Sequence, residues 1–109
     1  HPATLSPRVI GEVIRGRIGF PGLLVSDDLA MQALSGAPAD RAVAALAAGC
    51  DIALYCPGDP QGTAAVLAAV PDLTPEAATR LAQAAALARH RRLPLDRAAL
   101  LAERSALIP

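Results

Sequence analysis

Hydrophobic and polar positions follow a helical repeat over most of the chain. Between residues 9 and 14 the apolar positions lie on one face of a helix, and the preceding Ser6-Pro7 pair is typical of an N-cap and first turn. A Thr74-Pro75 pair opens the longest helical segment, whose basic last turn suits the negative end of the helix dipole. We expect this helix at residues 74–92 and further helices at residues 39–48, 61–70 and 97–104.

Two short apolar runs interrupt this repeat and predict β-strands. They cover residues 22–26 and 51–56, with Pro21 before the first and Pro57-Gly58 after the second. A helix that stops at Gly49 separates them, so the strands are expected to run parallel through a crossover rather than to form a hairpin. The order helix, strand, helix, strand, helix, helix, helix places the chain in the α/β class.

A parallel sheet of only two strands is not stable by itself. Its outer edges keep unpaired backbone groups, and its apolar faces need helices or further strands to cover them. The pattern therefore predicts that these 109 residues are part of something larger. The first residue is His1 rather than Met, which leads to the same expectation of a processed or truncated chain.

Two neighbouring carboxylates, Asp27 and Asp28, stand where the first apolar run ends. Active sites of α/β folds are built at the carboxyl ends of the strands, so this position suits a catalytic acid. The alternative is that one Asp only caps the following segment, which is the commoner role for an acid at such a place. The strand pattern alone leaves both interpretations open.

Composition and charge argue against several classes of protein. Of the residues, 53% are hydrophobic but only 2% are aromatic, which indicates a globular chain with a core of small side chains. Ten basic and ten acidic residues balance, so nothing favours binding to nucleic acid. No apolar stretch approaches the roughly 20 residues that span a membrane, and no signal-peptide pattern is present, so we expect no membrane partner.

The two cysteines, Cys50 and Cys56, flank the second predicted strand. Six residues of strand span roughly 20 Å, whereas a disulfide tolerates a Cα separation of at most about 7 Å, so the two cannot bridge each other there. No His or third Cys lies at metal-ligand spacing, so no metal site is expected. We expect buried free thiols in a reducing compartment, which favours the cytoplasm.

Four segments of the chain resemble one family of glycosidases. The most specific is the Ser-Asp-Asp-Leu-Ala-Met motif at residues 26–31, which comes directly after the apolar run Gly-Leu-Leu-Val. The others are Pro-Ala-Thr-Leu-Ser at residues 2–6, Ile-Gly-Phe at 18–20 and Ala-Gly-Cys-Asp-Ile at 48–52. Together they resemble the C-terminal part of a bacterial β-N-acetylhexosaminidase of glycoside hydrolase family 3, of the kind that acts in peptidoglycan recycling.

The resemblance implies a fold for the chain. Members of this family contain a (β/α)8 TIM barrel, in which the two predicted strands would be the seventh and eighth, with the C-terminal helices packed outside. Residues 1–109 would then form one partial barrel domain. Strands one to six, and with them about three quarters of a barrel of roughly 250 residues, would lie upstream.

The resemblance also implies roles for individual residues. Family members are retaining glycosidases in which the Asp at the position of Asp27 attacks the anomeric carbon and forms a covalent glycosyl-enzyme, a chemistry suited to a rigidly held carboxylate. Asp28 would instead orient the loop by hydrogen bonding. Met31 matches a family residue that contacts the sugar, although a Met at such a place is about as often a gap-filling core residue.

The remaining catalytic groups of the family lie upstream of this region. Its acid/base is a His paired with an Asp, and Lys-His and Arg residues hold the sugar; His1 and His90 match none of them, and we expect both to be structural or exposed. The resemblance implies a parent enzyme, without a cofactor, that removes terminal N-acetylglucosamine from muropeptides in the cytoplasm. The 109-residue chain alone is expected to be inactive.

Two other functions stay open from the sequence. The Ala-rich segments at residues 42–48 and 77–88 could belong to a stand-alone helical interaction module, which would require the isolated chain to be a well-folded monomer. A different barrel enzyme could use Asp27 as a base or a metal ligand, and metal-dependent activity of the parent would favour that alternative.

Overall fold

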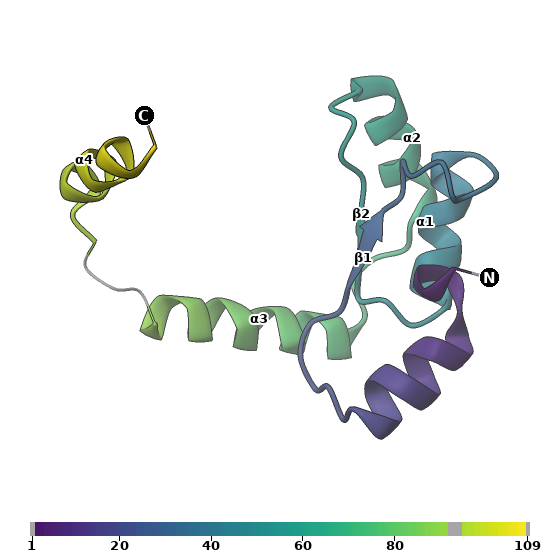
Figure 1. The fold of residues 1–109 in the computed structure, drawn as a ribbon. Helices are drawn as coiled ribbons and strands as arrows, with labels where there is room; N and C mark the ends of the chain where they lie inside the picture. Colours follow the sequence, from purple (N-terminus) through teal and green to yellow (C-terminus); the bar gives the residue numbers. More distant parts are fainter. Residues whose placement is uncertain (1, 92–94, 109) are drawn as a thin grey trace.

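The chain folds into helices around a small sheet, as the computed structural model shows for residues 2–91 and 95–108. The mixed helices and parallel strands confirm the α/β class (Figure 1). In chain order the elements are the 3-10 helix η1 (Ala3–Leu5), the π-helix η2 (Val9–Arg17), β1 (Val25–Asp28), α1 (Pro38–Ala47), β2 (Ile52–Leu54), α2 (Pro60–Ala69), α3 (Pro75–His90) and α4 (Arg97–Leu107).

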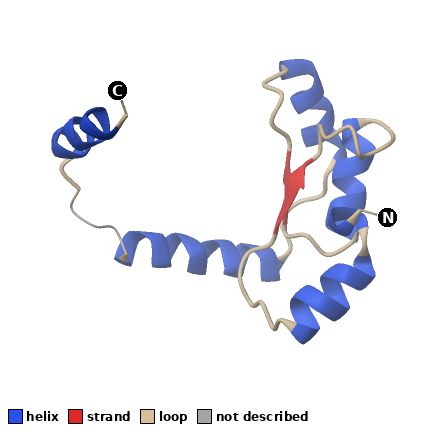
Figure 2. Ribbon diagram, viewed as in Figure 1, coloured by secondary structure: helices blue, strands red, loops and turns tan. Residues whose placement is uncertain are grey.

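The strands β1 and β2 pair in parallel and are joined through α1, as predicted (Figure 2). The predicted bounds of the first strand were wrong, because β1 begins three residues later and includes both Asp27 and Asp28. Before β1, the backbone is held by other contacts: the Leu24 carbonyl accepts the N–H groups of Asp51 and Ile52 at 2.8 and 3.2 Å. The second strand is also shorter than the predicted residues 51–56.

Most helix starts carry the capping groups that their sequences indicate. The Ser6 hydroxyl accepts the Val9 N–H at 3.3 Å, and the Thr74 hydroxyl accepts the Ala77 N–H at 3.1 Å, so both predicted N-caps are confirmed. At the end of α1, Gly49 has a φ of 111°, the left-handed conformation that ends helices. The prediction that the longest helix reaches residue 92 lies outside the described residues.

The first helix differs from the expected α-helix. Over η2 the turns are wide, and its last turn closes through an Ile18 N–H that donates to the Val13 carbonyl at 2.8 Å, five residues back. Gly16 fits this backbone because a Cβ there would lie only 3.2 Å from the Gly11 carbonyl oxygen. The predicted apolar face is nevertheless confirmed, since Ile10 is buried and Ile14 packs against the core.

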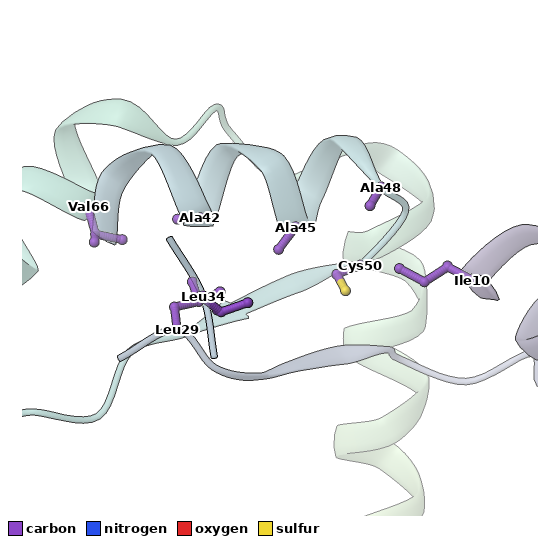
Figure 3. Packing of buried hydrophobic residues seen from close by; sticks show 8 residues of the cluster. All are labelled: Ile10, Leu29, Leu34, Ala42, Ala45, Ala48, Cys50 and Val66. Carbon is purple, nitrogen blue, oxygen red and sulfur yellow. The ribbon is translucent and has the colours of Figure 1, made fainter. Parts of the chain in front are cut away.

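The core is built from small side chains, as the composition indicates. Among the described residues, Leu29 is the one large side chain with no exposed surface. It directly follows the acid pair. Alanines from α1 close over it and keep that helix near the strands (Figure 3). The buried cluster consists of Ile10, Leu29, Leu34, Ala42, Ala45, Ala48, Cys50 and Val66.

One face of the sheet is open in the described part of the chain. Figure 1 shows α1 and α2 on the same side of the two strands. On the strands themselves, Val25 is 44% exposed and Leu54 is 40% exposed. Only one of the two faces is therefore covered by described residues, in line with the expectation that the faces of this sheet need further elements to cover them. Helix α3 buries only Ala77, and none of the described residues of α4 is buried. In the described ranges, no helix has the length and apolarity needed to cross a bilayer.

Candidate functional site

Asp27 lies at the carboxyl end of β1 on the open side of the sheet. Exposure alternates along this strand, so that Val25 and Asp27 are exposed while Ser26 between them is buried. The Asp28 N–H donates to Asp27 Oδ1 at 2.8 Å, and the Asp27 N–H donates to Thr4 Oγ1 over a longer 3.4 Å. Among the described residues, no basic side chain forms an ion pair with Asp27. Its carboxylate is thus oriented by the backbone and open to a ligand.

A bulge in β1 sets this orientation. Val25 pairs with Ile52 and Asp28 pairs with Leu54. Between these two pairs, β1 therefore contains one residue more than β2, which is a β-bulge. The Ser26 hydroxyl bridges the irregularity: its oxygen accepts the Leu54 N–H at 2.9 Å and its hydrogen is donated to the Asp27 carbonyl at 2.8 Å. Bulges of this kind commonly redirect a side chain beside an active site. The sequence did not predict this one.

Asp28 joins the ends of the two strands. Its Oδ1 accepts the Ala30 N–H at 3.0 Å, within its own segment, and the Cys56 N–H at 3.2 Å, just past β2. These contacts agree with the prediction that Asp28 orients the loop by hydrogen bonding. They also leave Asp27 as the acid of the pair whose side chain, among the described hydrogen bonds, contacts only its own strand.

Met31 lies on the segment that connects β1 to α1. It is half-buried and packs against the core cluster, which is the contact expected of a gap-filling methionine. The part of its surface that stays exposed leaves the sugar contact a prediction. Arg41, in the first turn of α1, holds this segment by donating from Nη1 to the Leu29 carbonyl at 2.7 Å and the Met31 carbonyl at 3.3 Å.

Asp51 is an ionic residue whose importance sequence reasoning missed. Its side chain is only 5% exposed and forms ion pairs with Arg15 Nη2 at 2.7 Å and Arg80 Nη1 at 2.6 Å. It also accepts the Leu24 N–H at 2.8 Å. A lone carboxylate inside an apolar run was the available signal, because a buried charge needs partners.

The pKa of Asp51 reflects two opposing effects. Burial by itself raises the pKa of a carboxyl group, because it penalises the charged form. The Leu24 N–H and the guanidinium groups of Arg80 and Arg15 outweigh it, and they hold the pKa of Asp51 below its usual value. This residue is therefore a charged anchor that ties η2, the approach to β1, and α3 to the start of β2.

The cysteines are free, but they differ in exposure. Cys50 is buried and its thiol points to the Thr4 carbonyl at 3.9 Å, whereas Cys56 is exposed. The expectation that both thiols are buried was wrong for Cys56, which lies beyond the end of β2 at Leu54 and is exposed. Desolvation and the nearby Asp28 and Asp27 carboxylates raise the pKa of Cys56.

The remaining candidates lie away from Asp27. His90 is the exposed last residue of α3, as expected, and the prediction for His1 falls outside the described residues. No three His, Cys, Asp or Glu side chains gather into a metal-binding group in the ranges 2–91 and 95–108. An apolar hollow of about 680 Å³ lies between α1, β2, α2 and the start of α3, where Val43, Leu67 and Leu73 are exposed.

Comparison with known proteins gives the context for this arrangement. Residues 1–90 match the model of the glycosyl hydrolase family 3 N-terminal domain. The chain is 46% identical over 82 residues to a β-hexosaminidase of Alkalilimnicola ehrlichii, which covers 73% of this chain and 23% of that protein. It is 40% identical over 104 residues to a β-hexosaminidase of Methylococcus capsulatus, which covers 94% of this chain and 30% of that protein.

A third relative, a β-hexosaminidase of Chromobacterium violaceum, is 41% identical over 91 residues, with 82% of this chain and 26% of that protein covered. The chain spans about a quarter to a third of the length of these curated relatives. The family model covers both strands, the acid pair and the helices through α3, and it ends before α4. The chain therefore belongs to glycosyl hydrolase family 3, within its N-terminal domain.

Proposed function

We propose that the chain is part of a β-N-acetylhexosaminidase, in which β1 and β2 are the last two strands of a (β/α)8 barrel. The parallel β1-α1-β2 unit is the repeating unit of such a barrel. The open sheet face with Val25 and Leu54 is of the kind that a barrel interior buries. The relatives' length leaves room for the other strands. We call the longer protein that would contain this chain the parent protein.

Asp27 is the proposed nucleophile of this enzyme. The observation that carries the proposal is its position, since it is the exposed carboxylate at the carboxyl end of β1 on the open face. Barrel enzymes hold their reacting groups at that end of the strands. The carboxylate of Asp28, by contrast, accepts hydrogen bonds from the backbone N–H groups of Ala30 and Cys56.

The proposed reaction proceeds with retention in two steps. Asp27 attacks the anomeric carbon and forms a carbon–oxygen bond as the glycosidic bond breaks, while an acid protonates the departing oxygen. Water, activated by the same group acting as a base, then cleaves the glycosyl-enzyme and frees Asp27. The acid/base and the groups that hold the sugar are proposed to lie in the upstream part of the parent protein.

The proposed substrates are peptidoglycan fragments that carry a terminal β-linked N-acetylglucosamine, hydrolysed in the cytoplasm. This choice is supported by the motif at residues 26–31, which resembles peptidoglycan-recycling members of the family. The two unbonded thiols, Cys50 and Cys56, fit a reducing compartment. A comparison of hydrolysis rates for muropeptides and for chitin oligosaccharides by the parent protein tests the substrate class.

The nucleophile is tested by trapping the covalent intermediate on the parent protein. A 5-fluoro analogue of N-acetylglucosaminyl fluoride, which slows the second step, is expected to add one sugar mass to the peptide that contains Asp27. Asp27→Asn should abolish the label, whereas the matched control Asp28→Asn should retain it, because an amide oxygen can still accept the N–H groups of Ala30 and Cys56. A label that persists in Asp27→Asn, or product formed with inverted configuration, contradicts the assignment.

The isolated chain provides a second test. A nucleophile without its acid/base partner and sugar-binding groups lacks a complete catalytic constellation, so we expect no hydrolysis of a chromogenic N-acetylglucosaminide by residues 1–109 alone. Hydrolysis by the purified chain that disappears in Asp27→Asn would show that the missing groups are not required, and would overturn this expectation.

A further inference from the structure

Arg41 makes an unusual set of contacts beside the proposed site. Its guanidinium donates to three backbone carbonyls of one segment: from Nη1 to Leu29 at 2.7 Å and Met31 at 3.3 Å, and from Nε to Gly36 at 3.0 Å. Within the described residues, no carboxylate lies at ion-pair distance from Arg41. Carbonyl dipoles, rather than an acid, therefore balance its charge.

The position of Arg41 on its helix is unfavourable for the helix itself. It lies in the first turn of α1, which begins at Pro38, and a cation near a helix N-terminus opposes the helix dipole. Its side chain is half-buried, so the opposing field is only partly screened by water. The stabilising contribution of Arg41 must then come from the carbonyl contacts, which fix the segment and not α1.

The segment that Arg41 holds is the one that carries Met31. Residues 29–36 begin two positions after Asp27, and Leu29 and Leu34 anchor the segment in the core (Figure 3). Between these anchors the chain turns, and the contacts from Arg41 reach both its start and its end at Gly36. The turn, and the place of Met31 relative to Asp27, are thereby tied to α1.

We propose that Arg41 is a positioning residue for sugar binding, which fixes residues 29–36 and with them Met31, four positions after Asp27. The inference rests on the proposed function and extends it to a residue that touches neither substrate nor reacting atoms. Asp27 itself is held by β1 pairing and by the Asp28 N–H, independently of Arg41. The loss of Arg41 should therefore weaken sugar binding more than it slows bond cleavage.

The test uses Arg41→Lys in the parent protein with a chromogenic N-acetylglucosaminide. A single ammonium group cannot span the carbonyls that the guanidinium fork reaches, so residues 29–36 should lose their fixed position. KM should then rise by on the order of tenfold, because part of the free energy of sugar binding is used to order this segment, while kcat changes by less than about twofold. The matched control is Arg8→Lys, because Arg8 is exposed and its one ion pair among the described residues is with Glu12, four positions further along the chain. Both kinetic constants should be unchanged in the control.

A double-mutant cycle separates positioning from a purely structural role. Met31→Ala should raise KM in the wild-type background and raise it much less in Arg41→Lys, because Met31 is already misplaced there. Lower thermal stability with unchanged KM, or additive effects of the two substitutions, would overturn the inference. Should Arg41→Lys fail to fold, Arg41→Gln, which keeps two N–H donors, serves in the same cycle with the same criteria.

Failure of the inference and failure of the proposed function give different results. If Asp27→Asn keeps full activity, the proposed function is wrong whatever Arg41 does. If Asp27→Asn is inactive while Arg41→Lys matches wild type in KM and in its coupling to Met31, only the positioning role is wrong.

Discussion

Asp51 and Asp27 stand at opposite ends of the same two-stranded sheet and are treated in opposite ways by the fold. Asp51 precedes β2, is nearly buried, and is neutralised by Arg15 and Arg80. Asp27 is exposed and lies near the carboxyl end of β1. Its carboxylate accepts only the Asp28 N–H among the described hydrogen bonds. The Asp51 carboxylate thus holds elements of the fold together, whereas the Asp27 carboxylate is accessible to a ligand.

This difference follows the polarity of parallel sheets. All strands of such a sheet point the same way, so their carboxyl ends form one edge, which barrel enzymes use for chemistry, while groups at the amino ends serve stability. The ion pairs join Asp51 to arginines that are 36 and 29 positions away in the sequence, and so close the amino end of the sheet. The two acids are therefore expected to fail in different ways when they are changed.

The largest expected effect is the loss of activity when Asp27 is replaced. Asp27→Asn in the parent protein should lower kcat by on the order of 10⁴-fold or more, as removal of a catalytic nucleophile does in other hydrolases. The melting temperature should stay near that of the wild type, because Asp27 has no ion pair among the described residues. Steady-state kinetics and thermal melts together check this, and an active Asp27→Asn variant would break the comparison.

Replacement of Asp51 should instead lower the stability of the protein. Asp51→Ala leaves Arg15 and Arg80 without their buried partner, and breaking a buried pair costs about 3–5 kcal/mol. Urea denaturation of the parent protein measures the free energy of unfolding. The matched control Glu12→Ala, which removes an exposed pair with Arg8, should change it by no more than about 0.5 kcal/mol. Equal effects of the two substitutions would contradict an anchoring role for Asp51.

A smaller effect should appear as a pH dependence of stability. The contacts of Asp51 lower its pKa in the folded chain below the ordinary value of 3.8, so its stabilisation is fully present above that value. It is lost as the pH falls through the folded pKa, where the carboxylate is protonated. The stability difference between wild type and Asp51→Asn should thus be constant near pH 7 and shrink below about pH 4. A difference that grows on acidification would reverse the sign and refute the ion-pair explanation.

The sequence predicted the features that depend on neighbours along the chain. N-caps such as Ser6 and Thr74 act on N–H groups three residues away, and the left-handed Gly49 ends its own helix. The α/β order and the parallel pairing came from the succession of helical and strand segments along the chain, with a helix between the two strands. These features need no knowledge of distant residues, which explains why the helices were placed to within a few positions.

The features that were missed depend on contacts between distant segments. The bulge at Ser26 forms because its hydroxyl takes the place of a backbone acceptor for Leu54, 28 residues away. Asp51 forms its ion pairs with arginines on η2 and α3, and no pattern in the neighbouring sequence predicts these partners. For the site, the sequence singled out Asp27 only through its family motif, while the exposure of β1 supplies the physical argument that separates it from Asp28.

The smallest expected effect compares the thiols at the two ends of β2. Cys50 is buried beside Asp51, and burial raises the pKa of its thiol, an effect that Asp51 increases and Arg15 opposes. Cys56 is exposed, and its raised pKa only slows its reaction. Iodoacetamide labelling of the folded parent protein, followed by peptide mass mapping, should therefore modify Cys56 faster at higher pH and modify Cys50 only as fast as the chain unfolds. Equal labelling of the two would mean that the amino end of the sheet is as open as the end that carries Asp27.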